Sequence, residues 1–200
     1  MRIFHSGRRW PGQDPSYTSC ENGVLMLIRS ELGDDHDAIA DVVARAFAAV
    51  RWSDHREHLM VDRLRRTEAF LPALSLLAEI DGKAVGHLLL TRAWIGAGAS
   101  ATETLALAPL SVVPERQNIG IGIGLVREAH RRALEMGFRS VLCVGNSSYY
   151  YRFGYQPLAD YPITLPFEAP VENQMILPLA TGALNGVAGV VRYAAGWLDH

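Results

Sequence analysis

The stretch Gln117-Asn118-Ile119-Gly120-Ile121-Gly122 lies between a strand-like run, Leu105 to Val113, and a helix-like run, Ile121 to Met136. A strand that passes through a glycine-rich loop into a helix directs several backbone N–H groups at one point, and glycines leave space there for a ligand. The first turn of the helix adds the positive end of its dipole. The stretch therefore predicts a binding site for an anion such as a pyrophosphate.

The segments around this loop predict a mixed α/β fold. Ser140 to Val144 is a short, almost entirely apolar run, so we expect a buried central strand that is parallel to the strand before the loop. Leu74 to Ile80 and Ala84 to Trp94 flank Asp81-Gly82, a favoured two-residue hairpin turn. Other strands are expected near Val24 to Leu32, Pro162 to Leu165 and Met175 to Leu179, and other helices near Asp34 to Phe47, Ser53 to Thr67 and Ser148 to Phe153.

This order of segments predicts one α/β (α+β) domain over residues 1–200, with a mostly antiparallel sheet and one parallel βαβ unit. Residues 1–22 are rich in Gly, Pro and Ser and are expected to be an irregular leader or arm. Residues 160–200 are expected to hold the C-terminal strands and a tail.

Composition argues against several classes of protein. The chain has a formal charge of −2 and a pI near 6.4, whereas nucleic-acid binders are usually basic, so we expect no nucleic-acid partner. No apolar run approaches the roughly 18 residues of a membrane span. Cys20 and Cys143 lack the spacing of a metal site or disulfide framework, and the seven histidines are scattered. We therefore expect no metal, no membrane partner and a reduced, cytoplasmic setting.

Several interpretations of the glycine loop compete. A P-loop needs a lysine after its second glycine, and no lysine is near. A Rossmann dinucleotide site needs GxGxxG and an acidic residue at the end of the next strand, but here the glycines stand at 120, 122 and 124 and Gly145-Asn146 follows that strand. A glycine-rich turn without any ligand stays open.

Val112 to Gly122 resembles the acetyl-CoA-binding motif of the GNAT superfamily of N-acetyltransferases, whose core is Gln/Arg-x-x-Gly-x-Gly/Ala. Tyr150-Tyr151-Arg152-Phe153-Gly154-Tyr155 is similar to the Tyr-x-Arg-Phe-Gly-Phe segment that these enzymes carry after the fifth strand. The resemblance runs from about Val24 to Tyr193. Over this range the chain is also similar to one bacterial branch of the family, the YhbS-like predicted acetyltransferases. It implies a sheet of six to seven strands flanked by about four helices, with acetyl-CoA as cosubstrate.

The resemblance also implies a reaction in which a primary amine, on a small molecule or a peptide, attacks the thioester carbonyl directly. It assigns to Val112 the backbone N–H that polarises this carbonyl. Tyr150 aligns with the tyrosine that protonates the leaving thiolate, with Tyr149 as the alternative because neighbouring helical residues point about 100° apart. The base is left open between Glu103 and His87.

The implied coenzyme site contains these residues and the glycine loop. Asn118 and Ile119 depart from the family, which often has Arg, Lys or Gly there, so backbone donors are expected to hold the pyrophosphate with help from Arg116 or Arg127. Asn146 either contacts the coenzyme or caps the helix that follows it. The expected coenzyme-binding residues are Leu110, Val112, Val113, Gln117, Asn118, Ile119, Gly120, Ile121, Gly122, Asn146 and Tyr150.

Two hypotheses of function follow from the resemblance. The first is an acetyl-CoA-dependent N-acetyltransferase, in which the tyrosine segment supplies the proton donor. The second is a catalytically silent CoA-binding regulatory module of the same fold, because the base is not identified. A homodimer formed through the C-terminal segment is a further expectation from the resemblance.

Overall fold

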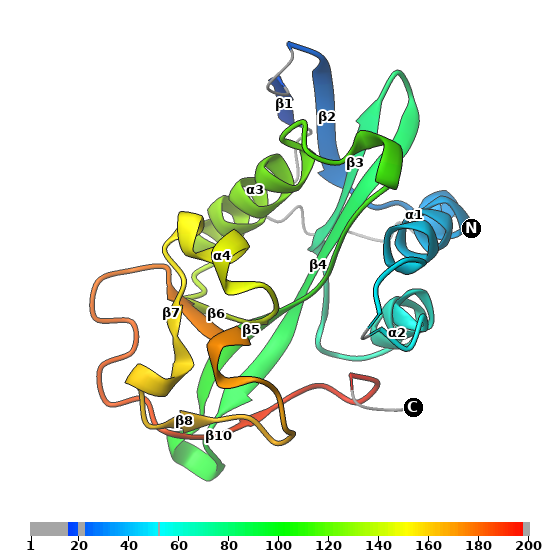
Figure 1. The fold of residues 1–200 in the computed structure, drawn as a ribbon. Coiled ribbons are helices and arrows are strands. Elements are labelled where there is room, and N and C mark those ends of the chain that lie inside the picture. The colour runs from blue at the N-terminus through cyan, green and yellow to red at the C-terminus, as the bar shows by residue number, and fades with distance from the viewer. Residues whose placement is uncertain (1–15, 20–22, 52, 198–200) are drawn as a thin grey trace, which may run out of the picture.

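The computed structural model describes residues 16–19, 23–51 and 53–197. Its helices are α1 (His36–Phe47), α2 (Glu57–Leu64), α3 (Ile121–Glu135) and α4 (Ser147–Tyr150). Its strands are β1 (Ser16–Ser19), β2 (Leu25–Ser30), β3 (Phe70–Ile80), β4 (Lys83–Ile95), β5 (Thr102–Val112), β6 (Ser140–Val144), β7 (Gln156–Pro157), β8 (Ile163–Thr164), β9 (Gln174–Pro178) and β10 (Gly189–Arg192). The strands form one sheet in the order β1-β2-β3-β4-β5-β6-β9-β7, and β10 pairs with β4 and β8 (Figure 1).

Helices cover both faces of this sheet, with α3 on one side and α1 and α2 on the other (Figure 1). Successive strand residues point to opposite faces, so each long strand supplies both layers of the core. Leu76 and Leu88 belong to the cluster that contains Leu125 of α3, whereas Leu77 and Leu89 belong to the cluster beneath α1 and α2. The nearly continuous apolar sequence of β3 and β4 follows from this two-sided burial.

The predicted hairpin and the predicted parallel unit are both confirmed. Asp81 and Gly82 have φ values of 51° and 71°, which is the pair of positive values that a type I′ turn requires between β3 and β4. β5 and β6 are parallel and are connected through α3, whereas β2 through β5 are antiparallel neighbours. The mixed, mostly antiparallel sheet that the sequence predicts is therefore present.

The pairing of β5 with β6 ends early, and this creates the opening that contains the site. Only Leu105, Ala106 and Leu107 of β5 have partners on β6, the last pair being Leu107 and Cys143. β5 continues to Val112 and stays paired with β4, and β6 ends at Val144. Beyond Leu107 the two strands are therefore neighbours in the sheet order without a shared ladder.

The sheet is larger than the six to seven strands expected. The additional strands are the short elements β1, β7, β8 and β10, each of two to four residues. Two residues cannot show a periodic pattern, so such strands are defined by their partners and not by their own sequence. Ser16–Ser19, which we expected to be irregular, form β1 on β2, while the remaining residues of the expected leader lie outside the described residues.

Within the described part of the chain, no helix is both long and apolar enough to cross a bilayer. The same residues contain no group of three His, Cys, Asp or Glu side chains placed to hold a metal ion. Cys143 is buried in the core as expected, and burial raises the pKa of its thiol to about 12. Cys20 lies outside the described residues.

Candidate functional site

The glycine loop presents backbone N–H groups at the start of α3. Asn118 and Gly120 both have positive φ values, 60° and 93°, which turn the chain sharply into the helix. The N–H of Gly124 donates to the carbonyl of Gly120 at 2.9 Å, and this is the first hydrogen bond of α3. The N–H groups of residues 121–123 therefore have no acceptor inside the helix and are available to an anion.

The Gln117 side chain connects the loop to β5. Its Nε2 donates to the carbonyl of Val112 at 3.1 Å. The N–H of Val113 donates to the carbonyl of Val85 on β4 at 3.0 Å. Because successive N–H groups of a strand point to opposite edges, the N–H of Val112 points away from β4, toward the opening beside β6.

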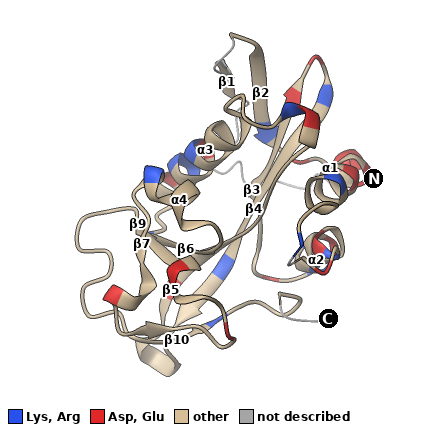
Figure 2. Ribbon diagram, viewed as in Figure 1, with Lys and Arg blue, Asp and Glu red and all other residues tan. Residues whose placement is uncertain are grey.

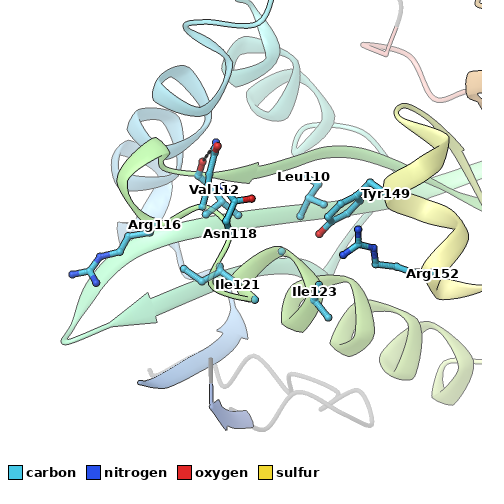
Figure 3. Close-up of a pocket in the computed structure, with 11 residues that line it drawn as sticks. Leu110, Val112, Arg116, Asn118, Ile121, Ile123, Tyr149 and Arg152 are labelled. Carbon is cyan, nitrogen blue, oxygen red and sulfur yellow. Dashed lines mark hydrogen bonds between the residues drawn. The ribbon is translucent and has the colours of Figure 1, made fainter. Parts of the chain in front are cut away.

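A cavity of about 460 Å³ joins the loop to this opening (Figure 3). Strand β5, the loop, the first turn of α3 and the α4 region all contribute to its wall. Seven of the expected coenzyme-binding residues line it, and four other residues complete the lining. The lining residues are Leu110, Val112, Arg116, Gln117, Asn118, Gly120, Ile121, Gly122, Ile123, Tyr149 and Arg152.

Tyr149 reaches into this cavity over the first turn of α3 (Figure 3). A Cβ atom on Gly122 would lie only 2.5 Å from the Tyr149 hydroxyl oxygen, so the hydroxyl occupies space that only glycine leaves free. The Arg152 guanidinium lies over the Tyr149 ring, 4.8 Å from its centroid. Burial raises the pKa of the Tyr149 hydroxyl, with an opposing effect from Arg152, so the group stays protonated near neutral pH.

Tyr150, which we expected to be the proton donor, does not line the cavity. Its side chain is buried in the core and packs edge-on against Tyr155, with ring centroids 5.4 Å apart. Burial raises the pKa of its hydroxyl well above the ordinary value. Adjacent residues of α4 point in different directions, so the cavity receives Tyr149 and the core receives Tyr150.

Three other expected coenzyme ligands also lie outside the cavity wall. Val113 is 2% exposed and belongs to the core beneath α3, and Ile119 packs against the same core. The Asn146 side chain caps α4, because its Oδ1 accepts a hydrogen bond from the N–H of Ser148 at 3.0 Å. Of the two roles considered for Asn146, the structure shows the capping role.

Two arginines line the cavity: Arg152 directs its guanidinium into it, whereas the side chain of Arg116 extends away from it (Figure 3). Arg116 was among the expected helpers, whereas Arg127 lines a separate hollow between α3 and β1. Arg152 was not assigned a role from sequence, although it stands inside the segment that resembles the family motif. Figure 2 shows basic positions along α3 and beside α4, whereas α1 and α2 on the other side of the sheet have both acidic and basic positions.

The two proposed bases lie in different surroundings. Glu103 pairs with Arg92 at 3.3 Å near the start of β5, at the opposite end of that strand from the cavity. Its position therefore does not support a role in the reaction. His87 is fully buried on the face of the sheet opposite α3, where its Nε2 is 3.0 Å from the hydroxyl of Ser75.

Known proteins resemble this chain in both sequence and structure. The model of the acetyltransferase (GNAT) family matches residues 38–155. The uncharacterized N-acetyltransferase YjhQ of Escherichia coli (strain K12) is 38% identical over 141 residues, covering 70% of this chain and 75% of YjhQ.

Two crystal structures are similar over most of their length. One is a GNAT family acetyltransferase from Brucella melitensis in complex with acetyl-CoA, with 31% identity, a TM-score of 0.71 and coverage of 86% of this chain and 97% of that one. The other is the GNAT family N-acetyltransferase YhbS from Escherichia coli in complex with CoA, with 26% identity, a TM-score of 0.78 and coverage of 88% and 93%.

Proposed function

The chain belongs to the acetyltransferase (GNAT) family, and on this premise we propose that it transfers the acetyl group of acetyl-CoA to a primary amine. The observation that carries the proposal is that a single cavity contains both the anion-binding start of α3 and the free edge of β5. A ligand that carries a pyrophosphate at one end and amide groups along its length fits both features.

The N–H groups of residues 121–123 and the side chains of Arg116 and Arg152 would hold the pyrophosphate. Backbone donors and Arg152, together with Arg116 once its side chain turns toward the cavity, would compensate for the missing side-chain cation at Asn118 and Ile119. The pantetheine arm would lie along the edge of β5 between Leu110 and Val112. The N–H groups on this edge, that of Val112 among them, would then donate to the carbonyls of the arm and of the thioester, where negative charge develops during attack.

Tyr149 is the proposed proton donor to the sulfur. The amine nitrogen attacks the carbonyl carbon, a C–N bond forms, the C–S bond breaks, and the thiolate takes a proton from the Tyr149 hydroxyl. The raised pKa of Tyr149 keeps that proton available near neutral pH. Tyr149 is preferred to Tyr150 because only Tyr149 lines the cavity.

The test measures thiol release from acetyl-CoA by the purified protein with a panel of small and peptidyl amines, together with calorimetry of coenzyme binding. Amine-dependent thiol release supports the proposal. Coenzyme binding without thiol release from any amine would favour a catalytically silent module instead. Absence of coenzyme binding would refute both functions.

A further inference from the structure

Four polar side chains meet inside the sheet beneath α1 and α2. Ser75 on β3, His87 on β4 and Ser111 on β5 are at most 1% exposed, and the side chain of Glu31, just after β2, is 5% exposed. This group, which we call the Glu31 cluster, lies among apolar residues such as Leu77 and Leu89. Buried polar atoms that lack partners are costly, so each one requires an explanation.

The hydrogen bonds of the Glu31 cluster determine which nitrogen of His87 carries the proton. The Ser75 hydroxyl donates to Glu31 Oε2 at 2.6 Å, because an ionised carboxylate only accepts. The Ser75 oxygen, 3.0 Å from His87 Nε2, must then accept from Nε2–H. His87 Nδ1 is consequently the unprotonated, basic nitrogen of the neutral ring.

This basic nitrogen has no hydrogen-bond partner among the described residues, and neither does the hydroxyl of Ser111. The two residues stand directly opposite each other on β4 and β5. Side chains in such pairs are close, with Cβ atoms about 4.5–5.5 Å apart. Ser75 and Ser111 flank His87 from the two neighbouring strands, so the imidazole has a hydrogen-bonded partner on the β3 side. On the β5 side, Nδ1 and the Ser111 hydroxyl are both unpaired among the described residues and are not hydrogen-bonded to each other in this structure, so the relay would require the Ser111 side chain to turn toward Nδ1.

Ser111 also lies at the reaction centre of the proposed function. It stands between Leu110 and Val112, whose side chains line the cavity on the α3 face. Alternation along β5 places the Ser111 side chain on the opposite face. Ser111 and His87 are both buried in this structure, so an amine would have to approach Ser111 past the free edge of β5, with His87 behind it.

We propose that His87 is the base that deprotonates the acceptor ammonium, that Ser111 relays the proton to His87 Nδ1, and that Ser75 and Glu31 position the imidazole. This inference rests on the proposed acetyl transfer. The ammonium gives one proton to the Ser111 oxygen while the Ser111 hydroxyl gives its own to Nδ1. The resulting amine attacks the thioester, and the nitrogen releases its second proton to solvent as the C–N bond forms.

The charged groups around His87 suit this role. Burial lowers the pKa of His87, so the ring is neutral and able to accept a proton near pH 7. Glu31, 3.7 Å from Nε2, opposes that shift and would stabilise the imidazolium once it forms, whereas Arg65 from the end of α2 favours the neutral ring. His36 of α1 lies 3.6 Å from Glu31 and completes the titratable groups that face the Glu31 cluster.

The decisive variant is Ser111→Ala. Removal of a hydroxyl that has no partner is not expected to lower the thermal unfolding midpoint, but loss of the relay should lower kcat/KM by about 100-fold, the lower end of acid–base contributions. Ser140→Ala is the matched control, because that buried hydroxyl on β6 is paired with Thr104 at 2.7 Å, at the opposite end of β5 from Ser111. The control should lose stability and keep its kcat/KM.

His87→Gln should remove the acidic limb of the kcat/KM profile between about pH 5 and about pH 9. Nitrogen-15 NMR of the wild-type protein tests the tautomer without reference to activity, and should show His87 protonated at Nε2. Protonation at Nδ1, or a Ser111→Ala variant with wild-type kcat/KM across this range, overturns the relay. If the wild-type protein releases no thiol with any amine, the proposed function fails, and the relay fails because it depends on that function. If the wild-type protein is active and Ser111→Ala is equally active, only the relay fails.

Discussion

Substitution of Gly122 by alanine would place a methyl group against the Tyr149 hydroxyl. The new Cβ would be 2.5 Å from the hydroxyl oxygen, 3.6 Å from Cζ of the same ring and 3.8 Å from Cγ2 of Val112. Only the first distance is far below van der Waals contact. Overpacking of this kind costs about 1–3 kcal/mol, whereas alanine in a helix is up to about 1 kcal/mol more favourable than glycine.

The two contributions can be separated by removing the hydroxyl. In a Tyr149→Phe background the 2.5 Å contact disappears and the next one, at 3.6 Å, is ordinary. Gly122→Ala should then raise the free energy of unfolding by up to about 1 kcal/mol, while in the wild-type background it should have no benefit or lower it by as much as about 2 kcal/mol. The coupling between the two substitutions is therefore expected to be about 1 kcal/mol or more.

Urea unfolding of the wild-type protein, both single variants and the double variant measures this coupling in one cycle. Calorimetry on the same four proteins should show weaker coenzyme binding for Gly122→Ala in the wild-type background, where the methyl group displaces the Tyr149 side chain, and near wild-type binding in the Tyr149→Phe background, because the family motif accepts alanine at this position. Free energies of unfolding that add within about 0.5 kcal/mol would refute the placement of Tyr149 over the start of α3.

Three further predictions concern single side chains. Tyr149→Phe should lower kcat by about 10²- to 10⁴-fold with little change in coenzyme binding, whereas the kcat of Tyr150→Phe should stay within a few-fold of wild type. Thiol-release assays measure both values, and a larger loss of kcat in Tyr150→Phe would identify Tyr150 as the proton donor. Arg152→Gln should raise the Kd for CoA by about 10- to 100-fold in calorimetry, while Arg139→Gln, outside the cavity, should leave it unchanged, and equal effects would contradict the assignment. Burial raises the pKa of Glu31, but His87, 3.7 Å away, and hydrogen bonds from Arg65 and Ser75 outweigh this effect and lower the pKa to about 2. A carboxylate with a lowered pKa contributes stability above about pH 4.5, and this contribution is lost as the pH falls toward about 2. Between these pH values the free energy of unfolding of Glu31→Gln should therefore fall by about 3 kcal/mol less than that of the wild-type protein. Parallel plots of unfolding free energy against pH for the two proteins would contradict the role of the Glu31 carboxylate.

Local patterns in the sequence predicted the elements that carry their own signal. Asp81-Gly82 specifies the hairpin because few residues accept its two positive φ values. The apolar run of Ser140 to Val144 predicts a strand buried on both faces, and the structure has it there. The resemblance to the acetyltransferase family, stated from the glycine loop and the tyrosine segment, is confirmed by the family match.

The remaining features depend on contacts between distant segments, which no local pattern contains. Three tyrosines in a row give no sign of which one faces the cavity, and the choice of Tyr149 follows from the space above Gly122. Arg152 enters the cavity only because α4 packs beside α3. The Glu31 cluster draws on four segments, so sequence reasoning identified His87 alone among its members.

The early end of the β5–β6 ladder also has a mechanical meaning. Only three residue pairs join the two strands, whereas nine pairs join β4 to β5, so this junction is the shortest ladder between the longer strands at the centre of the sheet. The last strand of the described residues, β10, connects the two sides of this junction, because it follows β9 in the chain and pairs with Trp94 and Ile95 of β4. The two halves of the sheet are therefore connected by β10 at the end away from the cavity and, within the described residues, have no strand pairing at the end that contains the cavity. A motion that widens the opening between β5 and β6 would strain the pairing of β10 with β4. The residues after Ala188 should therefore influence how far the opening can widen.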